Sequence, residues 1–193
     1  MNNFSVYFSL GFEHILHPLA YDHILFVVSL CLLFLPSTLK PLFWLVTAFT
    51  IGHSITLFLV ALKVFNAPLN IIEFLIPITI AVSAGYNIFI LYKKKQPILG
   101  LQYTITAIFG MVHGIAFATQ TFGLEGVKGI MLKVIGFNFG IEIAQLCIVA
   151  FMWFLTYIFV TKFKVPKPIL AQVGSVLILG FALFLAVENF KNL

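Results

Sequence analysis

Charged residues are scarce in this chain. They make up 9% of its 193 residues, and all eleven basic residues are lysines that stand singly or in short groups between apolar runs. Despite the net charge of +5, this pattern lacks the basic patch that nucleic-acid binding needs. Cysteine is rare too, and neither Cys31 nor Cys147 has a partner at the spacing of a zinc ribbon or a redox pair. We therefore expect no nucleic-acid partner and no thiolate metal site.

Apolar residues, in contrast, dominate the chain. Hydrophobic residues account for 62% of it, and the mean hydropathy is +1.12, far from the averages of soluble domains. A chain of 193 residues has room for several spans of about 20 residues with short loops, but little room for a soluble domain. We predict an all-α polytopic membrane protein, a single transmembrane domain over residues 1–193 that is surrounded by the lipid bilayer.

Apolar runs bounded by proline and lysine predict a bundle of about six transmembrane helices. The expected spans are 20–36, 41–63, 69–92, 98–118, 130–160 and 168–188. The preceding segment, 1–18, is too short to cross and carries Glu13 and His14 before Pro18, so we expect a short interfacial or re-entrant helix there. This segment has neither the basic n-region nor the cleavage site of a signal peptide, so we expect it to be retained.

The lysines predict the orientation in the membrane. Seven are expected on one side and four on the other: Lys40, Lys93, Lys94, Lys95, Lys162, Lys164 and Lys167 against Lys63, Lys128, Lys133 and Lys191. Because cytoplasmic loops carry the excess of basic residues, both termini of this multi-pass protein should be non-cytoplasmic. The small size is compatible with a homo-oligomer, although no segment specifies one.

Ionisable residues recur inside or at the edge of the expected spans, where each costs several kcal/mol unless something pairs with it. With the predicted orientation they fall at one level in the outer half of the membrane, because each helical residue advances about 1.5 Å. The residues of this level are His14, Asp22, His23, His53, Glu73, His113 and Glu142. Mutual coordination of one metal ion would satisfy all of them together.

Single residues of this set also have simpler interpretations. His53 could be a packing histidine bonded to a hydroxyl or a carbonyl. Glu73 opens a span and could be a helix-start carboxylate that the helix dipole stabilises. Asn138, Glu142 and Gln145 share one helix face, and a polar stripe on a deep helix is harder to explain without a site.

Small residues beside these positions predict close helix contacts. Gly110 and Gly114 flank His113, and Gly136 and Gly140 precede Glu142, both pairs at small-x-x-x-small spacing. Close backbones would let side chains of different helices meet at one ion. Imidazole and carboxylate ligands without sulfur suit nickel, cobalt, zinc or copper(II), and the residues alone do not separate these ions.

Short motifs spread over nearly the whole chain resemble, in their order, the HupE/UreJ family of bacterial membrane proteins, which are regarded as nickel or cobalt permeases. The motifs are GFEHI, YDHILF, FTIGHSITLFL, IIEFLIP, FGMVHGIAFA and FNFGIEIAQ. The resemblance implies metal ligands at His14, Asp22, His23, His53, His113 and Glu142, and an entry or supporting role for Glu73. From the polar stripe on one helix face we expect supporting or entry roles for Asn138 and Gln145 as well. His17 is not required by the pattern.

The spacing departs from the hydrogenase-linked members of the family. Seven residues separate His14 from Asp22, whereas four separate His17 from Asp22, as in the signature of nickel and cobalt permeases. The longer form resembles the branch found in Bacteroidetes-type bacteria.

The expected function is therefore that of a divalent-metal permease or metal-handling membrane protein of the nickel/cobalt type. An intramembrane zinc hydrolase is the alternative, with metal-bound water as nucleophile, Glu142 as general base and Ser54 nearby. A non-transporting metal sensor or assembly factor is the second alternative. No catalytic residue is firm, and the ion is nickel, cobalt or zinc.

Overall fold

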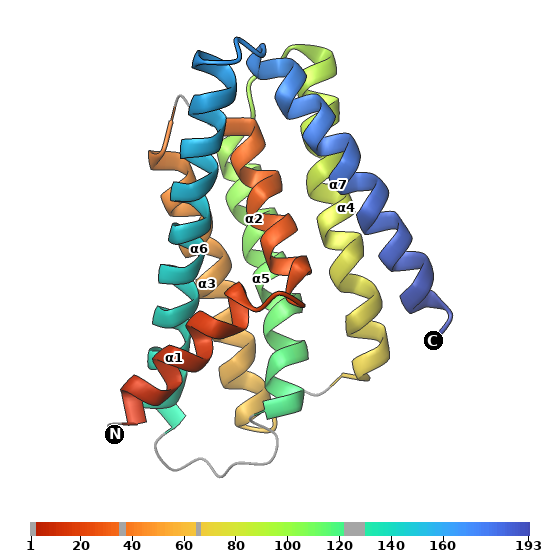
Figure 1. The fold of residues 1–193 in the computed structure, drawn as a ribbon. Coiled ribbons are helices and arrows are strands. Elements are labelled where there is room, and N and C mark those ends of the chain that lie inside the picture. The colour runs from red at the N-terminus through yellow and green to blue at the C-terminus, as the bar shows by residue number, and fades with distance from the viewer. Residues whose placement is uncertain (1–2, 35–37, 65–66, 122–129) are drawn as a thin grey trace.

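The computed structural model describes residues 3–34, 38–64, 67–121 and 130–193, and Lys128 lies outside them. These residues form helices and connecting turns without a strand, which confirms the predicted all-α class (Figure 1). The helices are α1 (Asn3–Leu16), α2 (Tyr21–Phe34), α3 (Lys40–Ala61), α4 (Leu69–Lys93), α5 (Leu99–Thr121), α6 (Ile130–Thr161) and α7 (Lys167–Phe190).

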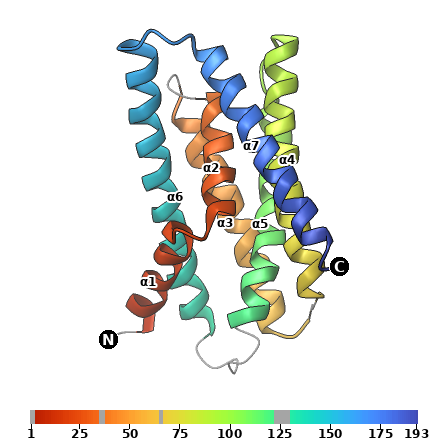
Figure 2. The same ribbon diagram turned by 45° about the vertical axis from the view of Figure 1, so that its right-hand side comes forward.

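Helices α3 to α7 are each long and apolar enough to cross a membrane. Helix α2 has only 14 residues, fewer than the roughly 20 that a bilayer needs. It passes the same test only together with α1, to which it is joined at an angle of 72° (Figure 2). The described chain thus holds five candidate spans, or six if the bent pair is a broken span or a re-entrant loop. This agrees with the predicted number and with the predicted short first helix.

The bend between α1 and α2 follows from the local sequence. Pro18 lacks the N–H that would continue α1. The turn after it closes through two bonds to His17, whose carbonyl accepts from the Ala20 N–H at 2.9 Å and whose Nδ1 accepts from the Leu19 N–H at 3.2 Å. Asp22 then stands in the first turn of α2, where a carboxylate is favoured by the helix dipole.

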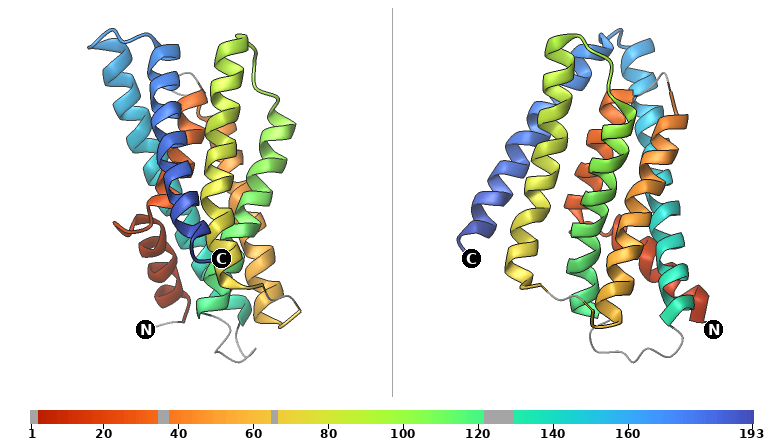
Figure 3. Two further views of the ribbon diagram at one scale, coloured as in Figure 1. Left: turned by 90° about the vertical axis from the view of Figure 1, so that its right-hand side faces the viewer. Right: turned by 180° about the vertical axis from the view of Figure 1, so that it is seen from behind.

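Helix α2 lies in the middle of the bundle, and the other helices pack as three pairs around it: α3 with α5, α1 with α6, and α4 with α7 (Figures 1 and 2). The pair of α3 and α5 runs in the same direction, side by side, in the rear view (Figure 3). Gly110 and Gly114 face α3 so closely that an added Cβ would overlap the carbonyl of Phe49 or lie 2.6 Å from the carbonyl oxygen of His53. The predicted close approach at these glycines is confirmed.

The pair of α1 and α6 depends on glycine in the same way. A Cβ at Gly11 would overlap the carbonyl of Phe137, and one at Gly140 would overlap that of Phe8. The oblique short helix therefore rests with its backbone directly on the first half of α6 (Figure 1). This contact determines where His14, one turn beyond Gly11, lies.

Helices α4 and α7 lie side by side at one flank of the bundle (Figure 1). Pro77 interrupts the hydrogen bonds of α4, because it has no N–H to donate to the carbonyl of Glu73. The side chain of Asn189 in α7 replaces that donor, with its Nδ2 2.6 Å from the Glu73 oxygen. The sequence of α7 thus compensates for the proline in α4.

The helix directions divide the described lysines between two ends, as predicted. Lys40 begins α3, Lys93 ends α4 and Lys167 begins α7, and these positions share what we name the lysine-rich end. Lys63 and Lys191 lie toward the opposite end, where both termini also lie. We name this the terminal end. The structure contains no membrane, so the orientation with the lysine-rich end toward the cytoplasm stays a prediction.

Candidate metal centre

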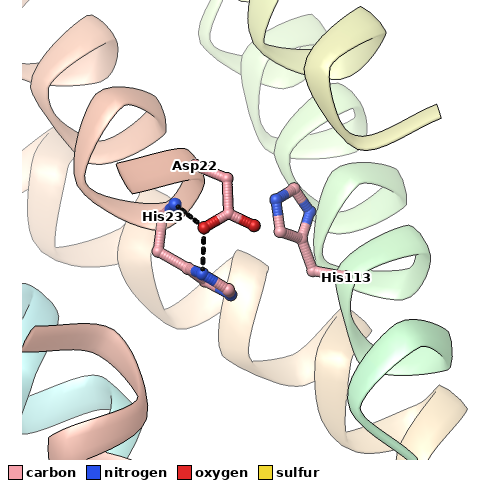
Figure 4. A group of neighbouring side chains, drawn as sticks. All are labelled: Asp22, His23 and His113. Atoms are coloured by element: carbon pink, nitrogen blue, oxygen red, sulfur yellow. Dashed lines mark hydrogen bonds and ion pairs between the residues drawn. The ribbon is translucent and has the colours of Figure 1, made fainter. Parts of the chain in front are cut away.

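Asp22, His23 and His113 form a compact group between α2 and α5. One possible ligand atom from each lies within 4.8 Å of the others (Figure 4). One carboxylate oxygen of Asp22 accepts from both the backbone N–H and the Nδ1 of His23, each at 2.9 Å. The other oxygen points toward His113 (Figure 4). The group therefore combines two imidazoles with one carboxylate from helices that are far apart in the sequence.

The hydrogen bonds of the imidazoles assign their tautomers. His113 Nδ1 lies 2.8 Å from the carbonyl oxygen of Phe109, which can only accept, so Nδ1 of the neutral ring carries the proton. His53 Nδ1 lies 3.1 Å from Oδ1 of Asn138, whose Nδ2 donates to the carbonyl of Val134 at 2.8 Å. That second bond orients the amide, so Oδ1 accepts from His53.

Three imidazoles thus have Nδ1 engaged with an acceptor, namely Asp22, Asn138 or a backbone carbonyl. This is the usual arrangement around metal-binding histidines, because the bond at one ring nitrogen holds the ring and leaves the other nitrogen with its lone pair free. The Nε2 atoms are then the ones that would face an ion.

Four imidazole Nε2 atoms are buried and have no hydrogen-bond partner among the described residues: those of His14, His23, His53 and His113. A buried polar atom without a partner costs about 1–3 kcal/mol, so several in one place need an explanation. The rings are neighbours, since the ring centroids of His14 and His113 lie 4.7 Å and 4.9 Å from that of His23. We call these four residues with Asp22 the histidine cluster, and its donor set fits a borderline divalent ion.

His53 belongs to the cluster although it lies outside the compact group. Its side chain is fully buried, and it packs on an aromatic ring that also contacts His113. Phe49 links them, with its ring centroid 6.1 Å from that of His53 and 5.3 Å from that of His113. The cluster therefore extends from α1 and α2 through α5 to α3.

A stacked pair of aromatic rings closes one side of the cluster. The centroids of Phe117 and Phe137 are 4.2 Å apart, and the pair contacts His14 through Phe117 at 4.5 Å and His53 through Phe137 at 6.0 Å. Apolar walls exclude water, which strengthens every electrostatic interaction with a bound ion.

A hollow of about 540 Å³ opens onto the cluster at the bend between α1 and α2, and we call it the vestibule. It is lined by Leu10, Glu13, His14, His17, Leu19, Ala20, Asp22, His23 and Phe117. His53 and His113, which are 0% and 1% exposed, are not among the residues that line it. The exposed His17 faces the vestibule, and its Nδ1 is engaged by the Leu19 N–H.

Glu73 lies at a second hollow, of about 330 Å³, between α2, α4 and α7. This Glu73 hollow is lined by Leu19, Tyr21, Asp22, Glu73, Ile76, Pro77, Leu185 and Asn189. Asp22 and Leu19 line both hollows. The carboxylate of Asp22 thus stands between the vestibule and a second polar recess.

The remaining candidates of α6 lie beyond Asn138, toward the lysine-rich end. Glu142 accepts from the Thr47 hydroxyl at 2.7 Å, and Gln145 from that of Thr50 at 3.4 Å. The Nε2 of the fully buried Gln145 has no partner among the described residues. Among the residues that the structure describes, the compact group of possible metal ligands around Asp22 does not include Glu142.

Ser54, the hydroxyl that the hydrolase alternative places near the metal, lies elsewhere. The Ser54 hydroxyl donates to the Thr50 carbonyl of its own helix at 2.7 Å. It lines an apolar hollow with Ile55, Phe58, Leu59, Met131, Val134 and Ile135, none of which belongs to the histidine cluster.

Sequence reasoning missed the partners that hold the ligands in place. Phe109 lies four residues before His113, so its carbonyl is within reach on the same helix, and this spacing could have indicated the bond. Thr47 and the stacked pair Phe117 and Phe137 are ordinary apolar-helix residues in the sequence. Their contacts with the site depend on how each helix is rotated about its own axis, which the sequence does not show.

A bundle of long apolar helices with buried imidazoles and a carboxylate, supported by hydrogen bonds at the far ring nitrogens, defines a class: polytopic membrane proteins with a histidine–aspartate cluster inside the helix bundle. A comparison with protein families matches residues 1–189 to the family described as HupE / UreJ protein. The chain belongs to the HupE/UreJ family. Comparisons with curated proteins and with solved structures found no match.

Proposed function

We propose that the protein is a permease, or a membrane protein that handles metal, for a divalent transition-metal ion of the nickel/cobalt type. The observation that carries the proposal is the set of four buried, unpartnered imidazole Nε2 atoms in the histidine cluster, two of which belong to the compact group with Asp22. The family suggests transport or handling of nickel or cobalt, which agrees with this donor set. Zinc fits the same ligands, so the choice among the three ions is left to experiment.

The proposed sequence of events begins at the vestibule. A hydrated ion meets Glu13, His14 and Asp22 there and exchanges water for imidazole and carboxylate. It then reaches His53 and His113, which are fully enclosed. Each ligating histidine must be neutral, so coordination releases any proton that the ring carried before. Glu73, which shares the second hollow with Asp22, attracts cations toward the same carboxylate.

Membrane orientation is part of the proposal. With the lysine-rich end toward the cytoplasm of the bacterial inner membrane, the vestibule and both termini face the opposite side. The ion then enters from outside and leaves at the lysine-rich end.

Uptake into proteoliposomes tests this function. The purified protein is reconstituted around a metal-sensitive dye, and Ni²⁺, Co²⁺ or Zn²⁺ is added outside. We expect uptake by the wild type, none by His23→Ala or His113→Ala, and near-normal uptake by His17→Ala, because the His17 Nδ1 is engaged by the turn. A wild type that holds one zinc tightly without any uptake would instead favour the hydrolase or the sensor.

A further inference from the structure

Three polar side chains meet in the interior of the helix bundle at some distance from the histidine cluster. Ser29 of α2 and Ser83 of α4 lie with their hydroxyl oxygens 3.0 Å apart. Asn87, one turn along α4, donates from Nδ2 to the carbonyl of Ser29 at 2.7 Å and to its hydroxyl at 3.3 Å. All three are buried, with exposures of 0%, 6% and 2%. We call them the hydroxyl–amide cluster.

A hollow of about 170 Å³ lies at the lysine-rich end of α2, α4 and α7. This Lys167 hollow is lined by Leu32, Leu33, Ile90, Leu91, Lys95, Gln96, Pro97, Lys167, Pro168 and Ala171. Its rim residues Lys95 and Gln96 are exposed, so it opens to solvent. Lys167 donates from Nζ to the carbonyl of Phe34 at 3.3 Å.

The hydroxyl–amide cluster lies directly below this hollow. Ser29 precedes Leu32 by three residues and Asn87 precedes Ile90 by three, so each lies on the helix face of a lining residue, one turn deeper. On α7, Ser175 follows the lining residue Ala171 by four. Its hydroxyl is fully buried and has no partner among the described residues. Each helix that lines the hollow thus places a buried oxygen beneath it.

The opposite end of this interface begins at the histidine cluster. The Glu73 hollow is walled by α2, α4 and α7 as well, and Asp22 is one of its lining residues. Asp22 and Ser29 are seven residues apart on α2, which corresponds to about 10 Å of helix. One helix interface therefore carries, in order, Asp22, the hydroxyl–amide cluster and a hollow open at the lysine-rich end.

We infer that this interface of α2, α4 and α7 is the exit path of the ion, and that the hydroxyl–amide cluster is a weak binding site on the way. The inference rests on the proposed function. Neutral hydroxyl, amide and carbonyl oxygens replace part of the hydration of a divalent cation without the strong binding of imidazole. Conduction needs such a graded affinity, since the ion must be bound well enough to enter and weakly enough to leave. The lysines at the rim disfavour rebinding after release.

Removal of the hydroxyls tests the inference. In Ser29→Ala/Ser83→Ala, Ni²⁺ binding to the histidine cluster should keep its wild-type affinity, because no ligand is changed. Uptake into proteoliposomes should fall about tenfold or more, since a hydroxyl bonded to a charged species contributes roughly that factor to an equilibrium. Thr106→Val removes a buried hydroxyl of α5 outside this interface and should leave uptake near wild type.

A variant that gains a metal site tests the inference without relying on a loss of transport. Asn87→Asp places a carboxylate in the hydroxyl–amide cluster, so the variant should bind a second Ni²⁺ per chain and release it slowly. Uptake by the double variant within twofold of wild type, or no second ion in Asn87→Asp, would overturn the inference while leaving the proposed function intact. A wild type without uptake would overturn both.

Discussion

Replacement of Gly11 by alanine should weaken metal binding, although Gly11 is no ligand. The added Cβ would lie 2.8 Å from the carbonyl carbon of Phe137 and would overlap its oxygen, both of which belong to the backbone of α6. Carbon atoms in contact rest about 3.5–4.0 Å apart, so α1 must withdraw from α6 by on the order of 1 Å. His14 lies one turn from Gly11 and moves with the helix.

The expected loss follows from the tolerance of a metal site. Ligand distances must agree with ideal values to about 0.2 Å, so a shift of this size removes His14 from coordination. Disturbing the support of a ligand typically lowers affinity by about 10- to 100-fold, and we expect Gly11→Ala to fall in this range. Titration calorimetry of the detergent-solubilised protein with Ni²⁺ measures it.

The matched control is Gly85→Ala. A Cβ at this position in α4 has nothing within 4 Å, so binding should be unchanged and stability equal or higher. Wild-type affinity in a folded Gly11→Ala variant would refute the reasoning, because it would mean that the position of α1 does not determine the site.

Further predictions concern the supports of the ligands and one helix end. Asn138→Leu removes the acceptor for His53 Nδ1 and should lower Ni²⁺ affinity about tenfold, whereas Asn138→Asp should retain binding; calorimetry decides. Asp22→Asn keeps the size of the side chain but removes the negative charge beside His23, so affinity should fall by at least as much, and an unchanged Kd would contradict the proposed charge balance. Lys94→Gly should stabilise the protein by about 1 kcal/mol, because Lys94, the residue that follows α4, has a φ of 52°, a conformation that favours glycine. An unchanged midpoint of thermal unfolding would argue against this.

The helices were predictable because proline and lysine interrupt nearly every apolar run. The expected span 69–92 corresponds to α4, Leu69–Lys93, and 168–188 to α7, Lys167–Phe190. The run 20–36 was harder, since its length resembles a full span. The structure instead has a 14-residue α2 that is bent against α1, and hydropathy contains no information about the angle at a break.

The sequence predicted the depth of each site residue along its helix, but not the direction in which its side chain points. Counting along the helices brings His53 and Glu142 to a similar depth, yet the α6 side chain bonded to His53 is that of Asn138, one turn earlier. Glu142 bonds to Thr47 instead. When a buried helix is apolar on all sides, its hydropathy hardly indicates which face points inward. The direction and the bonding partner of each side chain could therefore be found only from the packed structure.

The hydroxyl–amide cluster shows the same limit. Ser29, Ser83 and Asn87 are separated by more than 50 residues between α2 and α4, and serine in a membrane helix usually indicates only close packing. Their position beneath an open hollow becomes visible only when the three helices around it are assembled.

The central claim, that the histidine cluster holds a divalent ion, is tested most directly by the metal content of the protein. The purified, detergent-solubilised wild type is equilibrated with Ni²⁺, Co²⁺ or Zn²⁺ and analysed beside His53→Ala and His113→Ala. The account predicts about one ion per chain in the wild type and loss of that ion in both variants, with the helical content unchanged. Equal metal content in all three proteins, or no bound ion in the wild type, would contradict it.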